Sequence, residues 1–365
     1  MSARPFPQRE AAALLGLTSA AVVHVFGDGT HPTLLFLWLF PLLLWCAITV
    51  VRHADALADL LGEPYGTLLL TLSAVAMEVA LIAAAMLTGA EDPLVARDTM
   101  FAVLMIVLNG LVGLCLVIGA IRHGEQEFNL SGASAYLSVI ATLSVLTLVL
   151  PDFTTSRPNH GFTPAQAIFF SAVSLLLYGV FLQVQTSRHR AFFQEPGQEP
   201  RRQPPEEETH GHHARGTVRY HAFWLVLSLA PVLLLANNLS LAIERGARAL
   251  HLPQAIGGLL IAILVLAAEG ISAVAAARAN RLQRAVNIAL GSALSTIGLT
   301  IPAVMVICLI TGQAVVLGLA QDFRSLLLLT LFVSLLTFGT GRTNVLVGAV
   351  HLVLFAAYLA LIFMP

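Results

Sequence analysis

The sequence predicts an all-α polytopic membrane protein with eleven transmembrane helices, one extra N-terminal helix followed by two inverted five-helix repeats. Three observations carry this prediction. First, 57% of the 365 residues are hydrophobic and 11% are charged, whereas soluble domains carry roughly 25% charged residues. Second, apolar stretches long enough to cross a bilayer recur along the chain. Third, two lone glutamates occupy matching places in two of these stretches.

The apolar stretches define the spans, because a helix needs about 20 mostly apolar residues to cross a bilayer. The first stretch follows a charged start, as in a signal peptide, but no clear small-x-small cleavage site follows it, which favours a retained helix. Three cysteines, far apart within spans, are expected to be free thiols. The spans are expected near residues 10–27, 33–52, 66–89, 98–121, 132–151, 164–186, 221–244, 254–277, 285–311, 324–339 and 344–364.

The arginines orient the chain. All nineteen basic residues are arginine, which hints at a GC-rich bacterial coding sequence. With eleven spans, fourteen arginines fall on the side of the N-terminus and five on the other side. Basic loops stay in the cytoplasm. We therefore expect a multi-pass protein of the bacterial inner membrane, with the N-terminus and the long loop cytoplasmic and the C-terminus outside.

The long loop at 187–219 separates the two halves. Its prolines and mixed charges are typical of a flexible linker. Its histidines at 210, 212 and 213, with glutamates at 206–208, offer a metal or pH-sensing site as an alternative. A solvated linker is the favoured interpretation. The expected organisation is an extra helix at 1–30, a first repeat at 31–186, the linker at 187–219 and a second repeat at 220–365.

The two membrane glutamates indicate the inverted repeat. Glu78 stands in "TLSAVAMEVALIAAAML" and Glu269 in "IGGLLIAILVLAAEGISAVAAA", and each follows a glycine, Gly66 or Gly257, by twelve residues. The two spans are five apart, so their helices run in opposite directions across the membrane. Secondary transporters are built in this way, with the binding site near the midplane where the copies meet.

An ionised carboxylate in the membrane needs a partner, because its burial costs roughly 2.5–3.5 kcal/mol on insertion scales. No arginine lies mid-span to pair with either acid, which leaves protons or cations. The alternative is that both acids are neutral hydrogen-bond donors with a structural role. Burial disfavours the charged carboxylate and a nearby cation favours it. Protons and a cation would therefore compete for one pocket, and this favours obligatory exchange.

Polar residues on the next helices offer neutral oxygen ligands, which suit a hard cation. After Glu269, Ser292, Thr296 and Thr300 form a row at four-residue spacing, with Ser295 nearby. After the first acid, the corresponding helix offers Asn109. Small residues at such spacing are also ordinary packing positions between membrane helices, so both interpretations stay open.

Three segments resemble the cation/Ca²⁺ exchanger superfamily, specifically the ChaA-type bacterial calcium/proton antiporters: "LGEPYGTLLLTLSAVAMEVALI", "RHGEQEFN" with "SVIATLSVLTLVLPDF", and "AAEGISAVAAARANRLQRAVNIALGSALSTIGLTIP". The resemblance implies α-repeats on spans 3–4 and 8–9. It also implies that Glu78 and Glu269 are the essential acids. Asn109 and Ser292 match the serine of the family's "GS" within a position, and Ser295 matches a glutamine of many proton-coupled members.

One departure from the family bears on the transported ion. Most members carry Gly-Asn before each acid, where this chain has Ala74-Val75 and Val265-Leu266. The backbone carbonyls of Ala74 and Val265 are expected to serve as ligands if the helices unwind there. The predicted function is exchange of Ca²⁺ for protons by alternating access, and the alternative is Na⁺ or K⁺ exchange for protons in the same fold.

Two other classes compete with this prediction. An intramembrane protease would fit two membrane acids loosely, but the chain lacks H-E-x-x-H and G-x-S-x-G. A passive channel can be lined by buried acids, although paired glutamates on inverted repeats suit alternating access better. We therefore expect a transporter that is not an enzyme, has no cofactor and no nucleic-acid partner, and works in the lipid bilayer.

Overall fold

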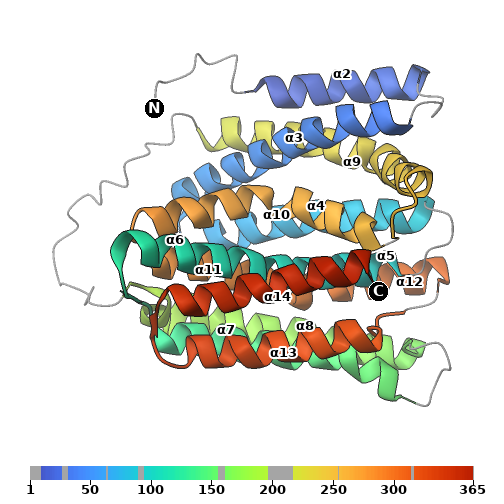
Figure 1. The fold of residues 1–365 in the computed structure, drawn as a ribbon. Coiled ribbons are helices and arrows are strands. Elements are labelled where there is room, and N and C mark those ends of the chain that lie inside the picture. The colour runs from blue at the N-terminus through green and yellow to red at the C-terminus, as the bar shows by residue number, and fades with distance from the viewer. Residues whose placement is uncertain are drawn as a thin grey trace.

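The computed structural model describes residues 10–26, 32–62, 65–88, 94–154, 161–195, 217–253, 255–313 and 316–364. In these ranges long helices lie side by side, and two short strands join two of their connections (Figure 1). Helix α2 (Ala11–Phe26) lies at one edge of the bundle. Helices α7, α8 and α13 lie at the opposite edge.

The helical runs follow the predicted spans closely. The first half contains α3 (Pro32–Leu61), α4 (Tyr65–Thr88), α5 (Val95–Met105), η1 (Ile106–Leu111), α6 (Val112–His123), α7 (Leu130–Ser144), η2 (Val145–Val149), η3 (Leu150–Phe153), α8 (Pro164–Gln183), η4 (Val184–Arg188) and η5 (Arg190–Phe193). The second half contains α9 (Val218–Ala249), α10 (Ala255–Arg278), α11 (Leu282–Ser295), η6 (Thr296–Thr300), α12 (Ile301–Thr311), α13 (Gln321–Phe338) and α14 (Val345–Phe363). The strands are β1 (Gln126–Glu127) and β2 (Arg342–Thr343).

The all-α membrane class is confirmed. In the described ranges nine helical runs are long and apolar enough to cross a bilayer, and two shorter apolar helices, Ala11–Val25 and Thr71–Leu87, fall in α2 and α4. Each predicted span therefore coincides with an apolar helix. The count of eleven crossings stays a prediction. Of the predicted linker at 187–219, residues 196–216 lie outside the described residues.

Side-chain caps explain where several helices begin. The side chain of Thr163 accepts a hydrogen bond from the backbone of Gln166, and the side chain of Gln166 accepts one from the backbone of Thr163, which together form a capping box. The first residue of α8 is a proline. Three other helices have a side-chain cap at their N-terminus that accepts from backbone N–H groups of the first turn. These caps are Asn129 on α7, Thr217 on α9 and Asn344 on α14. Polar residues between the apolar runs thus fix where these helices start.

The connections between helices meet in two groups at opposite ends of the bundle. At one end β1 pairs antiparallel with β2, and Gln126 donates to Asn280 over 2.6 Å, so three connections from distant parts of the chain join. At the other end Arg324 pairs with Asp152 at 2.9 Å, and Gly161 and Val316 form a bridge. Connections that the sequence assigns to one side of the membrane are therefore found together.

The acid-bearing helices α4 and α10 lie between two apolar cores. A smaller core holds residues of α2, α3 and α9, and Met77 of α4 and Leu264 of α10 belong to it. A larger core holds the remaining helices, and Ile82 of α4 and Leu266 of α10 belong to that one. In Figure 1, α4 and α10 accordingly lie between the α3–α9 pair and the rest of the bundle.

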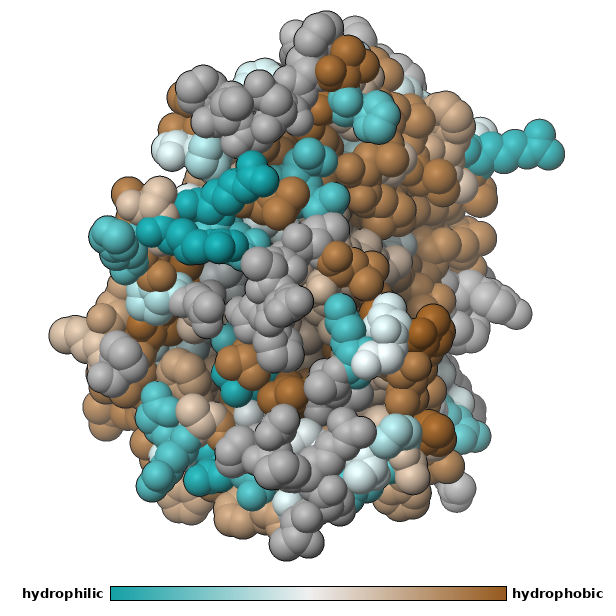
Figure 2. All heavy atoms as spheres, turned by 90° about the vertical axis from the view of Figure 1, so that its right-hand side faces the viewer, coloured by the Kyte–Doolittle hydropathy of each residue, from teal (hydrophilic) through white to brown (hydrophobic). Residues whose placement is uncertain are grey.

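Large apolar side chains cover the outer flanks of the bundle. On α8, for example, Ile168 and Phe169 are each 60% exposed and Leu176 is 69% exposed. Figure 2 looks at the end of the bundle opposite the start of α2, where hydrophilic side chains gather on the end and hydrophobic ones along a flank. Such exposed apolar flanks suit contact with lipid. A helix can face lipid in this way because its backbone hydrogen bonds are made within the helix.

Candidate ion-binding site

Glu78 of α4 is buried and held by hydroxyls from a distant helix. Only 2% of the residue is exposed. Its Oε2 accepts hydrogen bonds from Thr300 at 2.7 Å and from Thr296 at 3.1 Å. Its Oε1 is buried and has no partner among the described atoms. One carboxylate oxygen is thus held in place, and the other is available to a proton or a cation.

Glu269 of α10 is held by a hydroxyl of α11, the helix that continues into the turns carrying Thr296 and Thr300. Its Oε2 accepts a hydrogen bond from the hydroxyl of Ser292. The hydroxyl of Ser295 donates to the carbonyl of Ser292 at 2.9 Å. The run α11–η6–α12 therefore supplies hydroxyls to both acids, from Ser292 to Glu269 and from Thr296 and Thr300 to Glu78.

The helical geometry explains this shared supply. Side chains four residues apart lie on one face of a helix, one above the other. Ser292, Thr296 and Thr300 keep this spacing along the run. The π-helical stretch η6 spans Thr296–Thr300, and π-helical turns are frequent at functional sites. A single row of hydroxyls therefore passes between the two acids.

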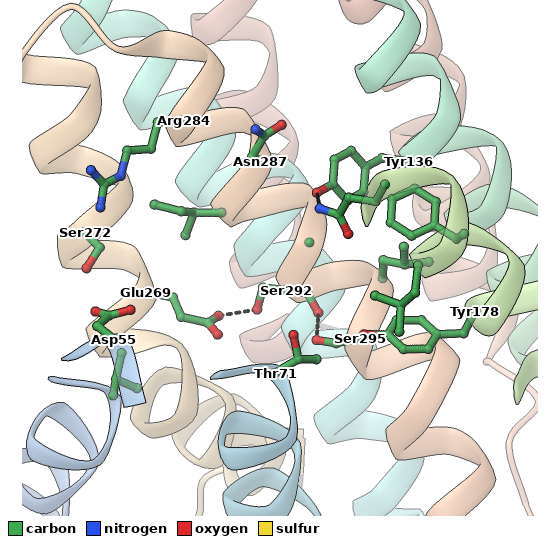
Figure 3. Close-up of a pocket in the computed structure, with 17 residues that line it drawn as sticks. Asp55, Thr71, Tyr136, Tyr178, Glu269, Ser272, Arg284, Asn287, Ser292 and Ser295 are labelled. Carbon is green, nitrogen blue, oxygen red and sulfur yellow. Dashed lines mark hydrogen bonds between the residues drawn. The ribbon is translucent and has the colours of Figure 1, made fainter. Parts of the chain in front are cut away.

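A cavity of about 300 Å³ borders Glu269 (Figure 3). Asp55 of α3 and Arg284 of α11 lie on its wall on either side of Ser272, and Asp55 is within electrostatic range of both Glu269 and Arg284. The lining does not include Glu78. The other polar residues that line the cavity are Thr71, Tyr136, Tyr178, Gln185, Asn287, Ser292 and Ser295.

The cavity lies on one side of the acids. Asp55 is near the end of α3, Gln185 is near the end of the α8–η4 run, and Arg284 is near the start of α11. All three helix ends belong to the side of the bundle on which the sequence places the N-terminus and the long linker. Glu269 is therefore approached from the side that carries most of the arginines.

Asn109 takes part in a different network. Its amide nitrogen donates to Thr330 of α13 at 2.8 Å, and its oxygen lies 3.2 Å from Nδ1 of His351 on α14. The other ring nitrogen of His351 lies 2.9 Å from the hydroxyl of Thr337. In the described structure these bonds tie the helix after the first acid to α13 and α14. They do not join Asn109 to either glutamate.

The backbone ligands expected from Ala74 and Val265 require unwound helices, and this condition is not met in the structure. Both α4 and α10 run through these positions as α-helix. Carbonyls inside an α-helix accept the hydrogen bond of the residue four positions later. Side-chain hydroxyls take the place of these carbonyls around the acids.

Three residues have a larger role in the site than the one predicted for them from the sequence. Thr296 and Thr300 appear in the predicted row but not among the predicted ligands. The row spacing was the signal that identifies them. Asp55, near the end of α3, lines the cavity beside Glu269. Sequence spacing cannot show that α3 approaches α10.

A resident metal is not indicated in the described part of the chain. No cluster of three or more His, Cys, Asp or Glu side chains that could hold an ion occurs there. The histidines at 210, 212 and 213, which the sequence offered as an alternative metal or pH site, lie outside the described residues.

Comparison with known proteins places these features in a family. The chain matches the sodium/calcium exchanger protein family over residues 31–187 and 220–364. It belongs to this family. Within the cation/Ca²⁺ exchanger superfamily it is a ChaA-type cation/proton antiporter, as the resemblance in the sequence implied.

Two curated relatives match nearly the whole chain. A putative ionic transporter, y4hA of Sinorhizobium fredii, is 46% identical over 357 residues, covering 96% of this chain and 95% of the relative. The sodium-potassium/proton antiporter ChaA of Escherichia coli is 37% identical over 358 residues, covering 97% and 96%. The Ca²⁺/H⁺ antiporter ChaA of Bacillus subtilis is 27% identical and covers 54% of each chain.

Solved structures confirm the fold of the family. The structure of native YfkE matches with a TM-score of 0.72 at 18% identity, covering 97% of this chain and 100% of that chain. The H⁺/Ca²⁺ exchanger CAX matches with a TM-score of 0.71 at 15% identity, covering 98% and 88%. At these identities the likeness concerns the fold.

Proposed function

We propose that the antiporter binds its cation and its protons in turn at one site formed by Glu78 and Glu269. The observation that carries this proposal is that a row of hydroxyls on one helical run, Ser292, Thr296 and Thr300, bonds to both carboxylates. These oxygens, with those of the two acids and of Ser295, make a set that a hard cation prefers.

Competition between ions gives exchange. A buried carboxylate favours protonation, whereas a cation beside it favours the charged form. With both acids protonated the site is neutral, and with cations in place of the protons it is again near neutral. The empty site would hold two buried charges, which is costly in a membrane. Occlusion without a bound ion is therefore disfavoured.

The packing supports two inverted repeats that move against each other. Helix α4 packs on η6 and α12 of the second half, and α10 packs on α5, η1 and α6 of the first half. Two further pairs join corresponding helices of the two proposed repeats, since α3 packs on α9 and α7 packs on α13. The boundary between the two apolar cores runs along the helices that carry the acids, which is where alternating access needs movement.

Na⁺ or K⁺ is the cation that these observations favour. Ca²⁺ takes six to eight oxygen ligands, and the site lacks the amide oxygens that most family members place before each acid. The relative named as a sodium-potassium/proton antiporter also covers nearly the whole chain. Ca²⁺ exchange for protons, the first expectation from the sequence, is the second candidate and is supported by the shorter match to the Bacillus subtilis Ca²⁺/H⁺ antiporter.

The hydrogen bonds in the structure suggest a role for each predicted side-chain ligand. Glu78, Glu269, Ser292 and Ser295 are proposed as direct ligands. Asn109 is proposed to hold the helix after the first acid in place through its bonds to α13 and α14. We also propose an inner-membrane location with the N-terminus cytoplasmic, supported by the arginine distribution and by the two groups of helix connections.

Transport in sealed proteoliposomes tests the proposal. An imposed pH gradient is monitored while Na⁺, K⁺ or Ca²⁺ is added, for wild type and for Glu78→Gln, Glu269→Gln and the control Glu127→Gln, whose side chain pairs with Arg342 at the surface. We expect Na⁺ or K⁺ to dissipate the gradient in wild type and control but not in the two site variants. A response to Ca²⁺ but not to Na⁺ or K⁺ would establish the second candidate. Full activity in both site variants would refute the two-acid site.

A further inference from the structure

Five polar side chains form a cluster at the N-terminal end of α2, away from the two membrane glutamates. Glu10, directly before α2, meets residues of α3 and α9. Its Oε2 lies 2.9 Å from Nε2 of His53 and 3.2 Å from Arg52, and its Oε1 accepts from Tyr220 at 2.8 Å. Nδ1 of His53 lies 2.9 Å from Nδ1 of His221. This His–Glu cluster joins three helices.

The central groups of the cluster are shielded from water. His53 is 1% exposed, Glu10 is 5% exposed and His221 is 7% exposed. Among the described residues, the charged and titratable groups that act on the two histidines are Glu10 directly before α2, Arg52 of α3 and the histidines themselves, with Tyr220 of α9 in contact. The neighbouring helices α4 and α10 carry one mid-span carboxylate each, and these belong to the ion-binding site.

The histidine contact determines how many protons the cluster holds. At 2.9 Å the two Nδ1 atoms share one hydrogen, so one of them donates and the other accepts. If both rings were fully protonated, two N–H groups would point at each other and the contact would break. With both rings neutral, the charges of Glu10 and Arg52 balance. The pair therefore accepts one further proton and no more.

That proton strengthens the contacts around it. When His53 is protonated, its Nε2 and the carboxylate of Glu10 form an ion pair, and the hydrogen bond from its Nδ1 to His221 becomes charge-assisted. Charge-assisted bonds are roughly twice as strong as neutral ones. The added proton consequently fastens Glu10, and with it the start of α2, to α3 and α9.

We propose that His53 and His221 form a second proton-binding site, which holds one shared proton and, when occupied, fastens α2 to α3 and α9. The ligand is a proton drawn from the side of the membrane on which the N-terminus lies. The site is separate from the two glutamates and does not carry protons across the membrane.

The position of the cluster suggests what its proton controls. Two residues beyond His53, Asp55 of the same helix lines the cavity beside Glu269, and α9 packs on α4, which carries Glu78. Fastening α3 and α9 to α2 stiffens the smaller core that must move during exchange. Acidification on the N-terminal side should therefore slow exchange. This regulatory consequence rests on the proposed antiport function, whereas proton binding does not.

Magnetic resonance of isotope-labelled histidine in the purified protein tests proton binding without transport. The ring signals are assigned with His53→Asn and His221→Asn, and His24, which is exposed at the other end of α2, serves as an internal reference. We expect the signals of His53 and His221 to move together, as the pH falls, in one step that takes up one proton. Independent uptake of two protons, or no uptake while the acidified protein stays folded, would overturn the proposal.

Transport with the pH varied on the N-terminal side tests the consequence. Protons also compete with the cation at the two glutamates, so every variant slows to some extent on acidification. We expect wild type to slow about fivefold more than His53→Asn and Glu10→Gln, the ratio expected when one hydrogen bond becomes charge-assisted, and the control His24→Asn to slow as wild type does. An unchanged pH profile in both cluster variants would refute the regulatory role. If wild type shows no exchange while the histidines share one proton, the antiport function fails and the proton site stands.

Discussion

At the scale of single residues, hydroxyl groups take the place of water around two membrane carboxylates. Thr300 and Thr296 donate to the same oxygen of Glu78, and Ser292 donates to Glu269. A hydrogen bond to the charged form of a carboxylate stabilises that form. The hydroxyls therefore lower the cost of ionising each acid inside the membrane, and this cost sets how well a cation competes with protons.

Replacing Thr300 by alanine tests this role. Loss of its bond leaves the charged form of Glu78 less stable, so protons compete more strongly with the cation. We expect roughly tenfold weaker apparent cation affinity, in keeping with about 1.5–3 kcal/mol for a hydrogen bond to a charged group. The measurement is the cation concentration that gives half-maximal exchange. Thr300→Ser should restore the affinity.

Thr311→Ala is the matched control, since that hydroxyl lies on the same helical run, at the end of α12, but donates to the carbonyl of Ile307. Equal losses in Thr300→Ala and Thr311→Ala would contradict the role assigned to Thr300.

At the scale of helices, the second acid is positioned by a close approach of α10 to α5. A Cβ built on Gly258 would lie 2.7 Å from the backbone nitrogen of Thr99 and 2.8 Å from the carbonyl carbon of Asp98. Side chains cannot occupy that space without separating the helices. Glycines commonly allow such contacts between membrane helices. The position of Glu269, three turns further along α10, depends on this contact.

Gly258→Ala should therefore lower stability, whereas its neighbour Gly257→Ala should not. The Cβ of Gly257 would meet Ile243 at an ordinary 3.7 Å. Overpacking typically costs about 1–3 kcal/mol, so we expect a clearly lower melting temperature for Gly258→Ala in detergent and a near-native value for Gly257→Ala. Equal melting temperatures for the two variants would show that α10 and α5 can separate freely.

At the scale of the whole molecule, the helix connections form two groups at opposite ends of the bundle, and the cavity beside Glu269 lies toward one of them. Positive charge favours the cytoplasmic side, and the end with the cavity carries most of the arginines. The site in this conformation is therefore expected to face the cytoplasm.

Cysteine labelling in intact cells checks this orientation. Gln194 lies after η5 at the N-terminal end, and Gln313 lies after α12 at the other end, and both are exposed. In a variant without the buried Cys46, Cys115 and Cys308, we expect Gln313→Cys to react with an impermeant maleimide and Gln194→Cys to react only after the membrane is opened. The reverse pattern would invert the topology.

Much of the fold could be predicted from the sequence, because membrane helices are specified locally. Apolar length decides where each helix runs, and caps such as Asn129 and Thr163 decide where it begins. The two acids were also predictable, since a lone carboxylate in an apolar span is costly. The contacts of Asn109 were not, because an amide binds equally well to an ion or to a neighbouring helix. The packing of α13 and α14 decided between them.

The sequence by itself determined the class of protein, the positions of the helices, the two glutamates and the row of hydroxyls, because each depends on the chemistry of residues close together in the chain. The tertiary structure decided which hydroxyl serves which acid, which aspartate lines the cavity and how Glu10 reaches His53. These contacts join residues far apart in the chain. They depend on which helices pack against one another. The apolar faces of the helices are too similar in sequence for these pairings to be predicted from the sequence.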